Sequence, residues 1–198
     1  MPFGAELVPD GGVRFRFFAP AAKSVRLAIE GRDSLPMQAD GHGWHELQVP
    51  DAGAGTLYRY VLPDGTDVPD PVSRFQPRDI AGPSEVIDPY AYAWQDEGWK
   101  GRPWAETVLY ELHLGTWTPE GTLQAATRRL DHLVQLGVTA IELMTLSDFA
   151  GTRGWGYDSV LLFAPDSAYG RPEDLKAFVD AAHQRGLQVL LDVVYNHT

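Results

Sequence analysis

The strongest constraint on the fold is the alternation of apolar runs and amphipathic segments from Thr107 onward. Three strand-length apolar runs, TVLYELHL, VTAIELM and LQVLLDVVYN, are separated by TLQAATRRLDHLVQLG and RPEDLKAFVDAAHQRG, whose apolar residues recur at helical spacing. Thr122 and Pro172 are suited to begin the two helices, and Gly137 and Gly186 are suited to end them. Strands without polar alternation are buried on both faces. The order β-α-β-α-β therefore predicts a parallel sheet covered by helices.

The longest connection in this half is the loop between the second strand and the second helix, about residues 145–170. Each helix closes in a glycine and the next strand begins at once, so the extra length lies at the carboxyl end of a strand. In parallel α/β folds the loops at that end build the functional site. We therefore expect the site to involve this loop.

Residues 1–98 follow a different pattern and are expected to form a separate domain. Gly, Pro and Asp interrupt the chain at short intervals, and the β-rich segments VRFRFFAP, SVRLAIE, WHELQVP and TLYRYVL lie between the breaks. In the first segment Val13, Phe15 and Phe17 alternate with polar residues, which is the period of a strand with one buried face. The pattern predicts a small antiparallel β-sandwich.

The segment Pro69–Pro89, PDPVSRFQPRDIAGPSEVIDP, contains five prolines and too many chain breakers for regular elements. We expect an ordered connector wrapped on a protein surface. The alternative is a flexible linker.

Composition excludes several kinds of partner and chemistry. The chain of 198 residues has a formal net charge of −11 and no run rich in Lys or Arg, so it is not expected to bind nucleic acid or anionic membranes. It has no cysteine, which excludes disulfides, zinc-thiolate sites and a cysteine nucleophile. The start MPFGAELVPDGG does not read as a signal peptide, and no apolar run is long enough to span a bilayer. We expect a cytoplasmic protein with a neutral or cationic partner.

Several motifs of the second half resemble the α-amylase superfamily of (β/α)8-barrel glycoside hydrolases, glycoside hydrolase family 13. They are RGWGYDSV, APDSAYGRPEDL, YELHLGTWTPEGT, LDHLVQLGVTAIELM and LDVVYNH. The connector, ELHLGTWTPEGT and RGWGYD are more similar to the maltooligosyltrehalose trehalohydrolases of that family than to its branching enzymes. The resemblance implies an early-set, immunoglobulin-like β-sandwich of the glycogen-binding-module type over residues 1–98. The first β-α-β-α-β part of a (β/α)8 TIM barrel would follow over residues 99–198.

The activity implied by the resemblance is hydrolysis of the α-1,4 bond next to a terminal trehalose unit, by the full-length enzyme and without a cofactor. Retaining glycosidases use two carboxyl groups about 5–5.5 Å apart, and the superfamily carries them on the fourth and fifth barrel strands. We expect this chain to end after the third strand, so we predict no catalytic residue within it. Glu111, His113 and Glu142 are better explained by ion pairs or hydrogen bonds inside the barrel. A 1,4-α-glucan branching enzyme and a non-catalytic α-glucan-binding fragment are the alternatives.

Tyr157 is the first of the substrate-binding side chains that the resemblance implies. At its position in RGWGYD the superfamily stacks an aromatic ring on the sugar whose bond is cleaved, which covers the apolar face of the pyranose and leaves its hydroxyls free. Trp155 is a second substrate-binding candidate, and Asp158 is expected to support the loop structurally. The alternative for Tyr157 is a tyrosine packed in the core.

Asp192 lies in the third apolar run, where a buried charge is costly unless it is paired. Residues at even spacing share a strand face, so Asp192 and Asn196 point to the same side. The resemblance implies that Asp192 and His197 bind the sugar and that Asn196 supports the site. From the residues alone, a core aspartate with a capping asparagine explains the pattern equally well. We predict no metal ion, because no further ligands are identifiable.

The open barrel part should be less stable than the sandwich. Three parallel strands with two helices leave an open sheet edge and one uncovered face. We expect thermal unfolding of these 198 residues, followed by circular dichroism, to show no cooperative transition of the helices. A cooperative helical transition in a monomer would contradict this expectation.

Overall fold

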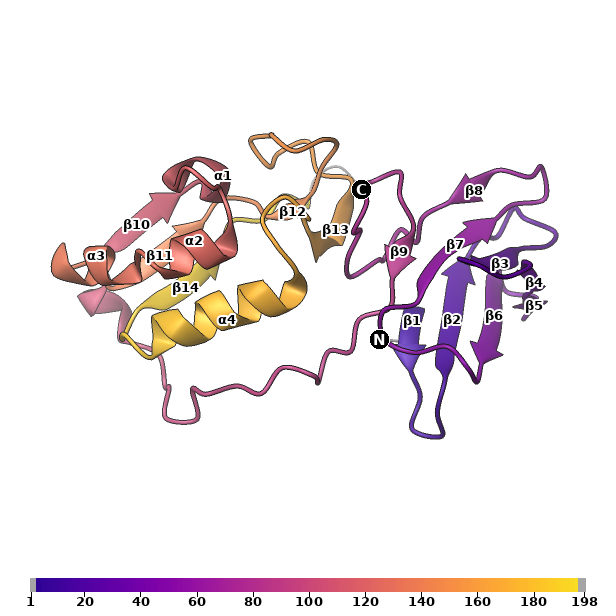
Figure 1. Cartoon of the computed structure of the whole chain (residues 1–198), viewed down its shortest axis with the longest axis horizontal. Helices are drawn as coiled ribbons and strands as arrows, with labels where there is room; N and C mark the ends of the chain where they lie inside the picture. Colours follow the sequence, from indigo (N-terminus) through magenta and orange to yellow (C-terminus); the bar gives the residue numbers. More distant parts are fainter. Residues whose placement is uncertain (1–2, 196–198) are drawn as a thin grey trace. The chain divides into compact units, whose positions relative to one another are not determined.

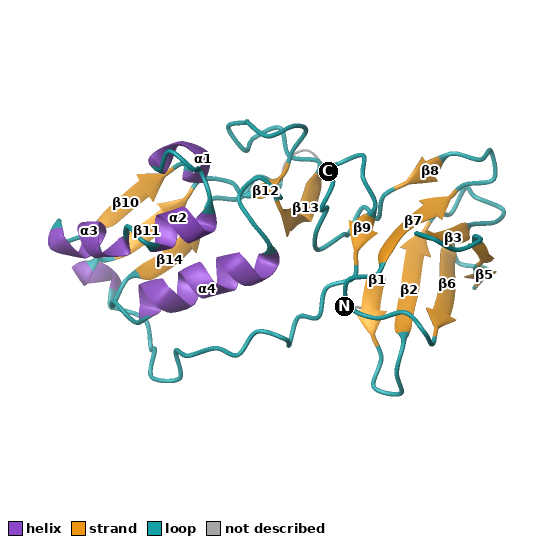
Figure 2. Ribbon diagram, in the orientation of Figure 1, coloured by secondary structure: helices purple, strands orange, loops and turns teal. Residues whose placement is uncertain are grey.

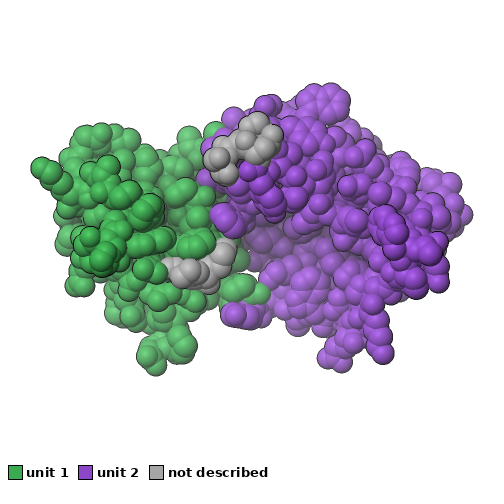
Figure 3. Space-filling model, turned by 180° about the vertical axis from the view of Figure 1, so that it is seen from behind, with its two compact units in different colours: residues 1–89 green, residues 90–198 purple. Residues whose placement is uncertain are grey.

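The chain divides into two compact units, Met1–Pro89 and Tyr90–Thr198, in a computed structural model that describes residues 3–195. Figure 1 follows the course of the chain, and Figure 3 separates the two units by colour. The sequence pattern places the boundary near residue 98, whereas the contacts assign residues 90–98 to the second unit. Within the described residues, no helix is long and apolar enough to cross a membrane.

The first unit is a sandwich of two antiparallel sheets, as predicted. One sheet has the strand order β1-β2-β6-β5, and the other has the order β4-β3-β7-β8 with β9 also paired to β7. The strands are β1 (Gly4–Leu7), β2 (Val13–Phe18), β3 (Arg26–Ile29), β4 (Leu35–Pro36), β5 (Gln38–Ala39), β6 (Trp44–Val49), β7 (Leu57–Val61), β8 (Asp67–Val68) and β9 (Ser84–Glu85). The alternation in β2 buries Phe15 and Phe17, whose rings pack on Tyr58 at 4.8 Å and on Tyr60 at 4.3 Å.

The connector Pro69–Pro89 is ordered and packs on the sandwich, which confirms that prediction. Its Asp70 is fully buried and accepts hydrogen bonds from the Tyr58 hydroxyl at 2.7 Å and from the Val72 amide at 3.0 Å. Burial raises the pKa of the Asp70 carboxyl, while these donors act in the opposite direction. The Ser84 hydroxyl accepts from the Asp70 amide at 3.0 Å. Apart from the short strand β9, side-chain bonds thus take the place of regular elements in a segment where prolines interrupt the backbone ladder.

The second unit contains the predicted parallel sheet, with strand order β10-β11-β14. Its strands are β10 (Leu109–Leu112), β11 (Ala140–Leu143) and β14 (Gln188–Leu191), and its main helices are α2 (Leu123–Thr127), α3 (Leu130–Gln135) and α4 (Pro172–His183). Figure 2 shows these helices on one side of the sheet. They bury Ile141 and Leu143 of the central strand in a core with Leu123, Leu130 and Phe178. The β-α-β-α-β prediction is confirmed.

The segment expected as one helix over Thr122–Gly137 is divided into α2 and α3. The Thr122 hydroxyl caps α2 by accepting from the Ala125 amide at 3.2 Å. At Arg129 the backbone leaves the helical region, with φ −105° and ψ 1°, and its amide bonds only three residues back. The Arg129 guanidinium lies 5.5 Å from the centre of the Trp117 ring. Trp117, which ends a short helix before α2, therefore holds the Arg129 side chain at the point where α2 and α3 separate. Helical periodicity alone does not detect such a local tightening.

Four short elements of the second unit lack a clear sequence signal. They are a 3-10 helix (Trp104–Glu106), α1 (Leu114–Trp117), β12 (Ser147–Asp148) and β13 (Leu161–Pro165). The last two form an antiparallel hairpin inside the long loop that follows β11. The hairpin fixes both ends of the segment that contains RGWGYD.

Residues 92–99 form a strap along the C-terminal half of α4. The Tyr92 hydroxyl and the Gln95 amide both donate to the buried carboxylate of Asp180, at 2.9 and 3.0 Å. The Trp99 ring stacks on His183 at 4.5 Å. Burial, followed by the bond to Asp180, raises the pKa of Tyr92 to about 12. These bonds explain why residues 90–98 belong to the second unit.

Replacing Asp180 should loosen the strap and destabilise α4. Asp180→Ala leaves two donors without their acceptor, and we expect it to lower the free energy of unfolding of the second unit by about 2 kcal/mol. Denaturant unfolding of the complete gene product, followed by the helical circular dichroism signal, measures this change. The control is Asp131→Ala, which removes an exposed ion pair with Arg185 and should cost under about 1 kcal/mol. Equal effects of the two substitutions would show that the strap contributes nothing.

Candidate active site

The candidate site lies where the three parallel strands end. In the register of the sheet, Glu111 of β10 is level with Glu142 of β11 and with Leu190 of β14. Paired residues of neighbouring strands face the same side, so both glutamates lie on the face that the helices leave uncovered. Asp192 is two residues after Leu190, and its amide donates to the Leu143 carbonyl at 2.9 Å. The ladder thus continues to Asp192 and places a third acid on this face.

Tyr157 and Asp192, both expected to bind substrate, are brought together by the fold. The Tyr157 hydroxyl donates to the Asp192 carboxylate at 2.7 Å, and the ring is 37% exposed. That hydrogen bond, with the negative charges of Asp192, Glu111 and Glu142, raises the pKa of Tyr157 to about 12. The ring is therefore held at one point and open to solvent, and its hydroxyl remains protonated at neutral pH. The alternative of a tyrosine packed in the core does not agree with this exposure.

His113, which directly follows β10, holds the loop that carries Tyr157. Because a carbonyl can only accept, His113 Nε2 carries the proton and donates to the Gly154 carbonyl at 2.8 Å. Its Nδ1 then lies 3.3 Å from the Thr116 hydroxyl, which can donate to it. Gly156 has φ +91°, and a Cβ there would lie 2.3 Å from the Thr145 carbonyl oxygen. The loop between Gly154 and Tyr157 is thus tied to the ends of β10 and β11.

The other residues predicted to bind the substrate or support the site are Trp155, Asp158, Asn196 and His197. Trp155 is 73% exposed, and its ring lies edge-on to His113 at 6.2 Å between centroids. Asp158 is exposed on the same loop, while the bond that fixes the loop comes from His113. Asn196 and His197 lie outside the described residues. Trp155 is therefore placed to meet a ligand.

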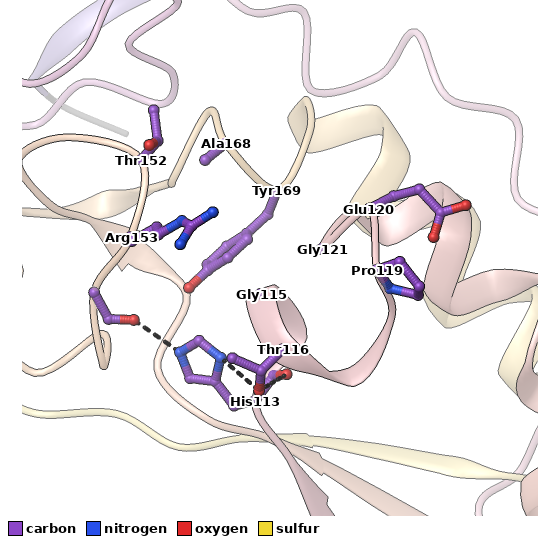
Figure 4. A pocket seen from close by; sticks show the side chains of 11 residues that line it. His113, Gly115, Thr116, Pro119, Glu120, Gly121, Thr152, Arg153, Ala168 and Tyr169 are labelled. Atoms are coloured by element: carbon purple, nitrogen blue, oxygen red, sulfur yellow. Dashed lines mark hydrogen bonds between the residues drawn. The ribbon is translucent and has the colours of Figure 1, made fainter.

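A hollow of about 460 Å³ lies beside this loop, and sequence reasoning did not predict it. Figure 4 shows its walls, which include His113, Thr116, Glu120, Arg153 and Tyr169. A second hollow of about 300 Å³ adjoins it, shares four of its residues and has Trp155 as a further wall. Arg153 and Tyr169 occur in the quoted motifs RGWGYDSV and APDSAYGRPEDL, but nothing in the spacing pairs them. Only the folded loop brings them together.

The site offers hydrogen-bonding groups and ring faces for a polar organic ligand. Within residues 3–195, no group of three or more His, Asp or Glu side chains is arranged to hold a metal ion. Aromatic rings beside carboxylates and a guanidinium are the groups with which proteins bind sugars, because a pyranose has apolar faces and a rim of hydroxyls.

Comparison with known proteins identifies the family. The family model described as the α-amylase catalytic domain matches residues 62–198 of this chain. The chain belongs to the α-amylase family. A second family model, carbohydrate-binding module 48 or isoamylase N-terminal domain, matches residues 2–91. The expected fold class, an immunoglobulin-like sandwich followed by the start of the α-amylase catalytic domain, is thereby confirmed.

Curated relatives in the α-amylase family include several trehalohydrolases. The chain is 49% identical over 195 residues to the malto-oligosyltrehalose trehalohydrolase of Deinococcus radiodurans, covering 98% of this chain and 32% of that protein. It is 50% identical over 187 residues to the Arthrobacter ramosus enzyme of the same name, covering 93% and 32%. It is 35% identical over 212 residues to the 1,4-α-glucan branching enzyme of Pseudoalteromonas atlantica, covering 96% and 29%. The chain spans about a third of the length of these relatives.

Solved structures of α-amylase family proteins have the same arrangement of elements. A Salmonella typhimurium protein provisionally assigned as an α-amylase is 53% identical, with a TM-score of 0.95 over 98% of this chain and 33% of its own. A Paenibacillus barengoltzii pullulanase, solved with maltohexaose and α-cyclodextrin, is 26% identical, with a TM-score of 0.85 over 99% and 38%.

The raised pKa of Tyr157 provides a test of the site geometry. In the complete gene product, the Tyr157 ring should show no titration by NMR up to pH about 11, whereas in Asp192→Asn its pKa should fall toward about 10. A neutral amide no longer opposes the phenolate. Asp158→Asn, on the same loop but exposed, should leave the titration unchanged. An identical titration of Tyr157 in the wild type and Asp192→Asn would exclude the bond as its cause.

Proposed function

We propose that the complete protein is a maltooligosyltrehalose trehalohydrolase, which cleaves the α-1,4 bond next to a terminal trehalose unit and releases trehalose. The observation that carries this proposal is the identity of 49–50% to proteins of that name along nearly all of this chain. The identity to a branching enzyme is 35%. The substrate is then an α-glucan chain that ends in trehalose, a neutral ligand that suits a protein with a net charge of −11.

Tyr157 is proposed to stack on the sugar at the cleavage point. Its hydrogen bond to Asp192 fixes the ring in advance, so little conformational entropy is lost when a sugar binds. Asp192 retains acceptor capacity for a sugar hydroxyl, because a carboxylate accepts more than one hydrogen bond. Trp155 and His197 are proposed as further substrate-binding residues, and Asn196 and Asp158 as supports of the site.

The chemistry is proposed to be a double displacement through a glycosyl-enzyme intermediate. It needs a nucleophilic carboxylate and an acid/base carboxyl group, which we place outside residues 1–198, in agreement with the share of the relatives that this chain spans. The described residues supply binding and electrostatics. Glu111, Glu142 and Asp192 share one face of the sheet, and their negative field favours the positive charge of an oxocarbenium-like transition state.

The sandwich is proposed to act as a glucan-binding module of the glycogen-binding type over residues 1–98. The match of residues 2–91 to carbohydrate-binding module 48 supports this role. We further propose a cytoplasmic location for the complete protein. A branching enzyme is the second candidate, which the relative from Pseudoalteromonas atlantica supports.

Product analysis of the complete gene product tests the proposed reaction. Incubation with maltooligosyltrehalose should release trehalose and one maltooligosaccharide, which contains all the glucosyl units that preceded the trehalose. Incubation with a linear α-glucan should create no α-1,6 linkages. New α-1,6 linkages without trehalose would assign the protein to the branching enzymes, and binding without any product would leave only the glucan-binding role.

Replacing Tyr157 should reduce this activity through loss of the stacked ring. We expect Tyr157→Ala to lower kcat/KM for maltooligosyltrehalose about 10- to 100-fold. Tyr157→Phe keeps the ring but loses the bond to Asp192, and should have a smaller effect. Tyr90→Ala, at a position where the side chain is 91% exposed, is the control for loss of a tyrosine. Full activity of Tyr157→Ala would exclude the stacking role.

A further inference from the structure

Tyr169 is a buried tyrosine whose hydroxyl group forms no hydrogen bond with the residues that the structure describes. The side chain is 3% exposed and packs edge-on against Phe149 at 5.9 Å and His113 at 6.3 Å between centroids. The ring is buried, but the hydroxyl is not fully enclosed, so it can meet water or a ligand. Tyr169 is part of the wall of the larger hollow, and Figure 4 shows its hydroxyl end directed toward the side of His113.

Arg153 is a second unused donor in the same wall. Its guanidinium makes no ion pair or hydrogen bond with any residue between 3 and 195, although it has five N–H groups. Glu120 lines the opposite wall, with its carboxylate turned away from Arg153 and Tyr169 and paired with Arg128 at 3.1 Å. The hollow is therefore lined by donors of Arg153 and Tyr169 that no residue between 3 and 195 satisfies.

The lining favours a neutral polyhydroxy ligand over an anion. Glu120 and the net charge of −11 oppose a phosphate or carboxylate. A sugar can accept hydrogen bonds from Arg153 and Tyr169 and pack its apolar face on the rings of His113 and Trp155. Gly115 forms part of the wall, where a Cβ would lie 3.1 Å from both the His113 and the Tyr169 ring. The volumes of about 460 and 300 Å³ are in the range of small-molecule sites, about 300–1,000 Å³.

We propose that this hollow is a sugar subsite for the oligosaccharide chain, which takes a glucosyl unit beyond the one that Tyr157 binds. The assignment rests on the proposed function, that the complete protein acts on an α-glucan. Gly154 connects the two places, since its carbonyl is held by His113 and it lies three residues before Tyr157. Two adjoining hollows suit a chain of repeated units, whereas a terminal trehalose is a single disaccharide. Arg153 and Tyr169 are the donors to this unit.

Tyr169→Phe tests the subsite with little risk to the fold. It keeps the ring that packs on Phe149 and His113 and removes only a hydroxyl that no residue between 3 and 195 bonds, so the melting temperature should not fall. Arg153→Met keeps the aliphatic stem of the side chain and removes the donors. The matched control is Tyr90→Phe, which removes a hydroxyl from an exposed ring.

The kinetic experiment compares substrates with one and with four glucosyl units beyond trehalose, in the complete gene product. For the longer substrate we expect KM to rise about 3- to 10-fold in Tyr169→Phe and about 10- to 100-fold in Arg153→Met. The shorter substrate does not reach the hollow. For it, neither variant should change KM or kcat by more than about twofold, which is less than the loss of one hydrogen bond would cause. Equal losses on both substrates, a lower melting temperature of Tyr169→Phe, or no loss on either substrate would overturn the subsite.

A binding measurement separates failure of the subsite from failure of the proposed function. Maltohexaose is titrated into the wild type and both variants by calorimetry. If the wild type releases no trehalose but binds maltohexaose more tightly than Arg153→Met and Tyr169→Phe do, the function is wrong and the subsite stands. If it releases trehalose but all three proteins bind maltohexaose equally, the subsite is wrong and the function stands.

Discussion

The candidate site depends on the parallel pairing of β11 with β10 on one side and β14 on the other. This register sets Glu111 level with Glu142 and continues through the bond between the Asp192 amide and the Leu143 carbonyl. Since all three strands run the same way, their carboxyl ends meet at one edge, and each strand contributes polar groups there. The helices pack on the opposite face through Ile141 and Leu143. Burial of one face thus fixes which side chains are left to form a site on the other.

Much of the scaffold follows from short-range patterns in the sequence. Apolar runs of strand length and helices closed by Gly137 and Gly186 predict the parallel sheet, because each pattern has a local physical cause. The break between α2 and α3 does not follow, since it involves the Arg129 side chain and the Trp117 ring rather than periodicity. The strap shows the same limit. Asp180 occupies a buried helix position, and only the folded chain reveals that Tyr92 and Gln95 satisfy it.

Site residues that belong to a sequence motif could be predicted. Residues that are distant in the sequence and come together only in the folded chain could not. Tyr157 and Asp192 are expected from their motifs, and the fold joins them by a hydrogen bond across 35 positions of sequence. His113, by contrast, reads in the sequence as a structural histidine at a strand end. Its role as the anchor of Gly154 depends on the hairpin β12–β13, whose two-residue first strand has no clear periodic signal. That no described residue bonds the Tyr169 hydroxyl is a result of packing, which no spacing in the sequence encodes.

The scaffold by itself does not determine which glucan bond is cleaved. A pullulanase at 26% identity retains the arrangement of elements with a TM-score of 0.85, although its name assigns it a different activity from that of the trehalohydrolases at 49–50%. Proteins of this family thus share a fold although their activities differ. Selectivity for one substrate has to come from the side chains at the edge of the sheet. In this chain the rings and polar groups that line the hollow at the sheet edge lie on two segments, the turn after β10 and the loop between β11 and α4. Because His113 bonds the first segment to the second, a change in either one alters the shape of the hollow that both of them line.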